Sequence, residues 1–282
     1  MPSAHAPDPP STGSPRDLAS WVAHFRQEEI PILAATAESL EALRENEDDI
    51  DARAIGELTS ADPLMTLKVL VYAAAHRSAA LTADVQSVTA AVMLMGTSPF
   101  FAAFGEQPTV EGRLQQQPDA LDGLRRVVRR SHRSGRFALA FAVHRNDHDA
   151  ALIHQAALLH DFAEMLLYCH APRDAIEIAE LQRRDASLRS LTAQQRVLGT
   201  DLLAVQHQLM RAWKLPGLMT RIAGDRETQH PGAMSVCLGV RIARHSSENW
   251  CNPALPDDVT AAGTLLNLSE SAVLALLHEI DF

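Results

Sequence analysis

The sequence has few cysteines and no long apolar run, and both absences limit what the protein can be. Its three cysteines, Cys169, Cys237 and Cys251, are scattered and odd in number. They match neither a disulfide framework nor a zinc pattern and therefore favour a reducing compartment. No apolar stretch approaches the ~20 residues needed to span a bilayer, and the N-terminus lacks the apolar core of a signal peptide. We expect a cytoplasmic protein with no membrane partner.

The chain also lacks an excess of positive charge. Its 282 residues carry a formal net charge of -10, and the sequence pI is near 5.7. Unspecific affinity for nucleic acid needs a basic surface, so a nucleic-acid partner is not expected. Hydrophobic residues make up 46% of the chain, which is ordinary for a globular protein of this length.

Strand signals are weak, because β-branched residues are few and nowhere alternate strictly, whereas apolar residues recur at helical spacing. The sequence predicts an all-α protein of two packed helical lobes. Residues 1–16, rich in Pro, Ser and Gly, should form a disordered tail. We expect an N-terminal helical bundle over 17–110 and a second bundle over 111–282, divided near the Gly- and Gln-rich stretch 105–119.

Several local signals predict where helices begin and end. Asp62 followed by Pro63 is a well-formed start signal, since the carboxylate can cap free amides and proline suits the first turn. Gly96 can terminate the helix that precedes it. The apolar stretch from Asp149 to Cys169 predicts one helix with an adjacent His-Asp pair in its middle, and another helix is expected from Thr192 to Trp213.

An ordered set of short motifs gives the sequence a family resemblance. The motifs are Ile30–Leu33, Leu58 with Ala61–Leu64, Ser87–Ala91 with Leu94–Gly96, Ala156–Asp161, Leu198–Asp201 and Trp213–Pro216. Together they resemble the HDOD domain, an output domain of bacterial signalling proteins that is related to the HD phosphohydrolases. The resemblance spans residues 20–280 and implies that the C-terminal lobe is HD-domain-like.

The sequence departs from the usual HDOD pattern at several polar positions. Ala73–Ala75 stand where an Asn-Ser pair is usual, and Ala163 and Glu164 replace a Gly and a Lys after the His-Asp doublet. Leu202 replaces a His, and a downstream His pair is missing around Asp225. The resemblance therefore implies a divergent member with a degenerate metal site.

The His160-Asp161 doublet is the first candidate site. In an HD phosphohydrolase such a doublet joins an upstream His and a further carboxylate to hold a divalent metal that activates water. The residues that could do so here are His132, His160, Asp161 and Asp201, with Asp225 as an alternative to Asp201. Glu164 would place negative charge where a phosphate arrives. We favour a vestigial doublet that is buried and hydrogen-bonded to neighbouring helices, with no catalytic residue and no cofactor.

A run of arginines is the second candidate site. Arg125, Arg129, Arg133 and Arg136 recur at helical spacing, with Arg126 and Arg130 beside them. Like charges at this spacing repel, so carboxylates from elsewhere, solvent or a bound anion must offset them. Because the guanidinium fork suits phosphate, the stripe could bind a nucleotide second messenger or a phosphorylated partner, although a face paired with neighbouring carboxylates is the more conservative interpretation.

Three functional hypotheses follow. The first is a non-catalytic regulatory module of bacterial signal transduction that binds other signalling proteins or a small ligand. The second is a metal-dependent phosphohydrolase of a nucleotide or cyclic dinucleotide that uses the doublet. The third is a nucleotide-sensing effector that uses the arginine stripe without turnover.

Overall fold

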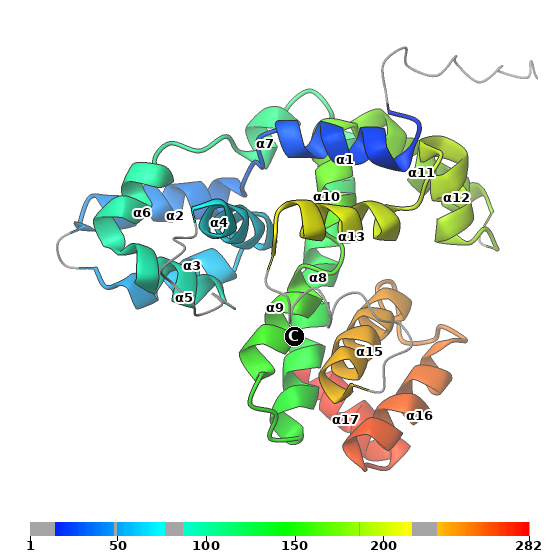
Figure 1. The fold of residues 1–282 in the computed structure, drawn as a ribbon. Helices are drawn as coiled ribbons and strands as arrows, with labels where there is room; N and C mark the ends of the chain where they lie inside the picture. Colours follow the sequence, from blue (N-terminus) through cyan, green and yellow to red (C-terminus); the bar gives the residue numbers. More distant parts are fainter. Residues whose placement is uncertain (1–14, 48–49, 77–86, 186, 216–229, 282) are drawn as a thin grey trace, which may run out of the picture.

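The structure, a computed structural model, describes residues 15–47, 50–76, 87–185, 187–215 and 230–281. Within these ranges the regular structure is helical, apart from one isolated parallel bridge between Ile32 and Thr109. The predicted all-α class with packed helical lobes is therefore confirmed (Figure 1).

The first half of the chain contributes seven helices that are described: α1 (Leu18–Gln27), α2 (Ala34–Arg44), α3 (Ala52–Ser60), α4 (Pro63–Ala75), α5 (Val88–Met95), α6 (Thr97–Ala103) and α7 (Val110–Arg113). The second half contributes α8 (Pro118–His144), α9 (Ala150–Leu158), α10 (Phe162–His170), α11 (Pro172–Arg184), α12 (Ser190–Leu198), α13 (Leu202–Ala212), α15 (Pro231–His245), α16 (Leu255–Leu266) and α17 (Glu270–Ile280).

Helices α2 to α6 pack around a cluster of buried side chains that includes Ile55, Met65 and Phe100. The predicted helix start at Asp62 is confirmed. The Oδ1 atom of Asp62 accepts hydrogen bonds from the amides of Leu64 at 2.8 Å and Met65 at 3.2 Å. These bonds satisfy amides that a helix N-terminus otherwise leaves without partners.

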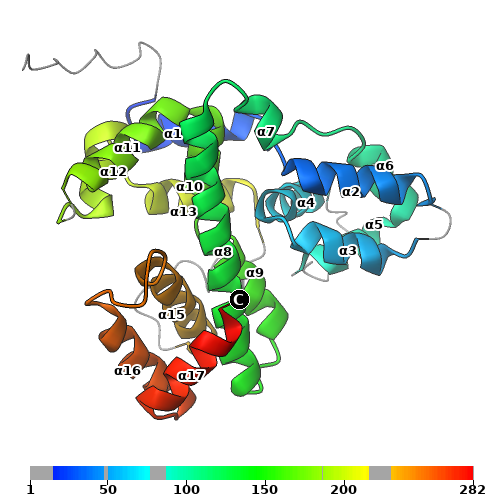
Figure 2. The same cartoon turned by 180° about the vertical axis from the view of Figure 1, so that it is seen from behind.

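Helix α8 is the axis of the C-terminal lobe, with 27 residues that run past α9, α10 and α15 (Figures 1 and 2). At the crossing with α15, a Cβ on Gly239 would lie 2.8 Å from the carbonyl oxygen of Ser134. Only glycine allows the two backbones to approach so closely. Beyond this crossing, Phe137 and Phe141 of α8 pack into a cluster with α16 and α17.

Two predicted helices are each divided in the structure. The predicted single helix over 149–169 is wrong, because α9 ends at Leu158 and the His160-Asp161 doublet lies in the break before α10. Both helices are buried on several sides, so their apolar pattern runs on without marking the break. The predicted helix over 192–213 is also wrong, since Gly199 ends α12 with φ of 70° and Asp201 starts α13.

The N-terminal segment packs on the C-terminal lobe. Trp21 and Phe25 of α1 belong to the buried cluster that α8, α10 and α13 share, and the Trp21 indole donates to the carbonyl of Leu198 at 3.1 Å. Residues 1–14 of the expected tail lie outside the described residues. The division of the chain at residue 110 stays a prediction.

No single helix among those described has the length and hydropathy needed to cross a bilayer. Helices α16 and α17 reach that length and hydropathy only as a pair, and they are bent by 100° relative to each other.

Candidate functional site

The doublet lies at the junction of α9 and α10, on the side that faces α8. His160 and Asp161 contact each other, with Nδ1 of the imidazole 2.9 Å from Oδ1 of the carboxylate. The Asp161 side chain is 8% exposed, against 19% for His160. The carbonyl of Asp161 accepts the amides of Glu164 and Met165, which begins α10. The backbone of Asp161 thus starts the helix while its side chain is left to other partners.

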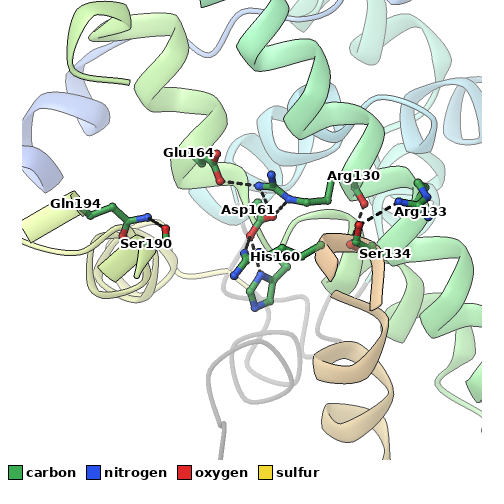
Figure 3. A network of polar contacts seen from close by, with 10 residues as sticks. Arg130, Arg133, Ser134, His160, Asp161, Glu164, Ser190 and Gln194 are labelled. Atoms are coloured by element: carbon green, nitrogen blue, oxygen red, sulfur yellow. Dashed lines mark hydrogen bonds and ion pairs between the residues drawn. The ribbon is translucent and has the colours of Figure 1, made fainter. Parts of the chain in front are cut away.

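Two arginines from distant helices contact the Asp161 carboxylate. Arg130 of α8 donates from Nε to Oδ2 at 2.8 Å, and Arg244 of α15 donates from Nη2 to Oδ1 at 3.2 Å. Arg130 also donates from Nη2 to Oε2 of Glu164 at 2.6 Å. Figure 3 shows the Arg130 guanidinium between the two carboxylates. Both oxygens of Asp161 are therefore occupied, and α8, α10 and α15 are joined by one ion-pair network.

The electrostatics of the site follow from these contacts. Burial alone would raise the pKa of the Asp161 carboxyl, but the charges of Arg130 and Arg244 and the hydrogen bond from His160 lower that pKa well below its usual range. Burial alone would likewise lower the pKa of Arg130, and the charges of Glu164 and Asp161 raise it instead. Both shifts favour the ionised forms of Asp161 and Arg130 at neutral pH.

A cleft of about 240 Å³ opens beside the doublet. It is lined by both members of the doublet, Arg130 and Arg244, and also by Glu164, Gln194, Asp201 and Gln206, among others. Asp201 reaches the cleft as the N-cap of α13, and its Oδ1 accepts the amide of Ala204 at 2.9 Å. The structure therefore brings three of the four predicted metal ligands to one cleft.

The fourth predicted ligand, His132, does not line this cleft. Burial lowers the pKa of His132, and the charges that act on it come from Asp62 and Arg136. Across the part of the chain that the structure describes, no three His, Cys, Asp or Glu side chains gather closely enough to hold a metal ion. Asp225, the alternative carboxylate, lies outside the described residues. The described residues do not fit the metal centre of an HD phosphohydrolase.

Comparison with known families decides the relationship that the motifs indicate. The family model of the HDOD domain matches residues 30–227, which is well over half of the chain. The chain belongs to the HDOD family. The resemblance drawn from the motifs is thereby confirmed.

Two solved structures share the fold of this HDOD chain. One is the MmoQ response regulator of Methylococcus capsulatus strain Bath, with 19% identity, a TM-score of 0.65, and coverage of 89% of this chain and 98% of that one. The other is a virulence factor, cj0248, of Campylobacter jejuni subsp. jejuni, with 17% identity, a TM-score of 0.62, and coverage of 94% and 93%. No curated protein matches the chain significantly.

The predicted arginine stripe does not act as one unit in this HDOD structure. Nη1 of Arg125 lies 3.7 Å from Oδ1 of Asp122 on the same helix. Arg136 also interacts with another group. Arg133 forms an ion pair with Asp281 at 2.6 Å, so part of the stripe is paired with a neighbouring carboxylate. Arg129 and Arg133 line a groove that runs along α8. The other two members of the stripe do not line it.

The structure adds residues that the sequence did not single out. Arg244 completes the contacts of Asp161, and Arg183 of α11 joins the groove along α8. The sequence could have predicted the partner of Glu164. A carboxylate where the family usually has a lysine indicates that a cationic side chain lies nearby. Arg130 supplies that cation, whereas no local pattern points to Arg244 or Arg183.

Proposed function

We propose that this HDOD chain is a non-catalytic regulatory module that acts by binding other signalling proteins. The observation that carries the proposal is the complete engagement of Asp161 by His160, Arg130 and Arg244. A carboxylate that ligates a metal must offer an oxygen lone pair to the cation. Here each oxygen already accepts from a cationic side chain, and the Arg130 guanidinium lies directly against the carboxylate.

Metal binding at the doublet would have to break this buried network. Removing one partner of a buried ion pair typically costs about 3–5 kcal/mol, because the other charge is left without compensation. An incoming metal would also meet the positive charges of Arg130 and Arg244. The arrangement therefore favours a structural role for the doublet over the phosphohydrolase hypothesis.

A regulatory role is further supported by the comparisons. One protein of the same fold is described as a response regulator, and this chain belongs to the HDOD family. Exposed apolar patches mark many protein–protein contact surfaces, and Met93 and Leu94 of α5 are adjacent and 64% and 55% exposed. We propose this part of α5 as a contact surface for a partner protein.

The test is a metal titration combined with an assay of phosphodiester hydrolysis. The purified protein is incubated with excess manganese, iron or zinc, desalted and analysed by elemental mass spectrometry beside the His160→Ala variant. We expect the wild type to retain far less than one metal ion per chain, equal to the variant, and to leave a cyclic dinucleotide intact. Near-stoichiometric metal that disappears in His160→Ala, or turnover that requires His160, would overturn the proposal in favour of the phosphohydrolase.

A further inference from the structure

A second groove, which shares Arg130, Glu164 and Gln182 with the doublet cleft, runs along α8, between α10 and α11 on one side and the segment 246–250 with Asp281 on the other. Its volume is about 930 Å³, which is at the upper end of the range of small-molecule sites. We call it the arginine groove, after the five arginines that line it: Arg126, Arg129, Arg130, Arg133 and Arg183.

The arginine groove is positive in a chain whose formal net charge is -10. Its lining holds five arginines against three carboxylates, which are Glu164, Asp281 and Glu248. Two of the arginines are already engaged. Arg130 holds Glu164 at 2.6 Å, and Arg133 holds both oxygens of Asp281 at 2.6 and 2.7 Å.

The other three arginines, Arg126, Arg129 and Arg183, are exposed and form no ion pair or hydrogen bond with any other residue that the structure describes. Arg126 and Arg129 lie one turn apart on α8, and Arg183 lies in the last turn of α11 on the facing wall. Positive groups that converge on a concave surface raise its potential and concentrate anions there. Glu248, the one carboxylate of the groove without an ion pair among the described residues, is also exposed.

The chemistry of the lining points to a phosphorylated ligand with an aromatic part. Guanidinium groups bind phosphate oxygens through paired N–H donors, and two walls bearing arginines suit more than one phosphate. Trp250 also lines the groove and is only partly buried. Its indole contacts the rings of Phe137 and His278, at 6.4 and 4.4 Å between centroids, and its partly exposed surface can contact a base.

We propose that the arginine groove binds a nucleotide that carries two or more phosphate groups. Arg126, Arg129 and Arg183 bind the phosphates, and Trp250 contacts the base. The ligand joins α11 to the segment that follows α15, because the groove has one wall from each. Arg130 lines both the groove and the doublet cleft. Phosphate in the groove therefore adds a negative charge near Arg130, which is the cation that Asp161 and Glu164 share. The site needs no metal at the doublet and includes no residue of α5.

Isothermal titration calorimetry on the full chain tests the proposal, with GTP, cyclic di-GMP and inorganic pyrophosphate as probes. The test variants are Arg126→Gln and Arg183→Gln. Two matched controls come from the neighbouring positions, Arg125→Gln on α8 and Arg184→Gln on α11. Neither lines the groove, and each is paired with a carboxylate of its own helix, Asp122 or Glu180.

We expect at least one of the two nucleotides to bind with the affinity weakened about tenfold to hundredfold in each test variant, which corresponds to loss of a charge-assisted contact. The controls should change the affinity less than threefold, and Trp250→Leu should weaken nucleotide binding without affecting pyrophosphate. Absence of binding for all three probes, or equal affinity in test and control variants, would overturn the site. Pyrophosphate binding as tightly as either nucleotide would overturn the assignment of the base to Trp250. The calorimetry does not measure metal content, so a failure of the groove proposal can be distinguished from a failure of the regulatory proposal.

Discussion

The guanidinium of Arg130 lies against the carboxylate of Asp161, with Nε 2.8 Å from Oδ2, although 31 residues separate the two in the chain. The contact joins the middle of α8 to the start of α10, in a place where the arginine is 16% and the aspartate 8% exposed. Such a pair is costly to assemble and more costly to break. It makes the doublet a structural junction, and this leads to the first prediction.

Replacing Arg130 by alanine should destabilise the protein by about 3–5 kcal/mol, because Asp161 and Glu164 lose their shared cation in a buried position. Urea unfolding followed by circular dichroism measures the loss. Arg125→Ala on the same helix is the control, since its exposed ion pair with Asp122 should contribute at most about 1 kcal/mol. A loss for Arg130→Ala no larger than that of the control would show that the network does not hold α8 to α10.

Stability should fall as the pH is lowered from about 7 to 4, because of His170 at the end of α10. Burial, together with the charge of Arg113, lowers the pKa of its imidazole to about 4 despite the nearby carboxylate of Glu28, and the charge of His24 adds to the lowering. Between the unfolded pKa near 6.5 and this value, the unfolded chain binds a proton that the folded chain does not. Acid therefore favours unfolding over this window, by about 3 kcal/mol in full.

The His170→Gln variant checks this prediction through the pH dependence of its unfolding free energy. Without the imidazole, the decline in stability between pH 6.5 and 4 should become shallower than in the wild type. His148→Gln, which removes an exposed histidine, should leave the wild-type slope in place. Parallel curves for His170→Gln and the wild type would contradict the assignment.

Alanine at Gly239 should destabilise the crossing of α8 and α15, even though alanine favours a helix more than glycine does. The new Cβ would lie 2.8 Å from the carbonyl oxygen of Ser134 and 3.0 Å from the amide nitrogen of Ala138. Both are backbone atoms of α8, so the helices must separate, at a net cost of about 1–3 kcal/mol. Thermal unfolding measures the effect. Gly105→Ala, where no atom lies closer than 3.6 Å, should leave the melting temperature nearly unchanged.

Loss of the Asp62 carboxylate should affect more than one helix end. Besides capping α4, its Oδ2 accepts the amide of Leu33 at 2.8 Å from the start of α2, and the residue is fully buried. We expect Asp62→Ala to cost about 2–4 kcal/mol, from the lost cap and the stranded Leu33 amide. Asp51→Ala, an exposed cap with one bond to Ala54, should cost about 1 kcal/mol or less. Equal losses for the two variants in urea unfolding would rule out the shared role of Asp62.

The sequence by itself determined the helical class, the family and several helix ends. Helical spacing of apolar residues and the absence of alternating patterns exclude a sheet protein, and the Asp62-Pro63 pair marks a helix start through contacts within three residues. Such local signals survive without knowledge of the fold, since the atoms that make the contact are close in the chain. The order of the motifs, with His160-Asp161 among them, is also a property of the sequence alone.

The tertiary structure decided what the doublet and the arginines face. The break between α9 and α10 is hidden in the sequence because both helices are apolar on several sides, and the partners of Asp161 lie 31 and 83 residues away. Helical spacing selected Arg125 and Arg136 together with Arg129, yet only packing against α11 and the segment after α15 determines which arginines share a groove. Long-range charge pairing depends on how helices cross, and the local periodicity of a sequence does not contain that information.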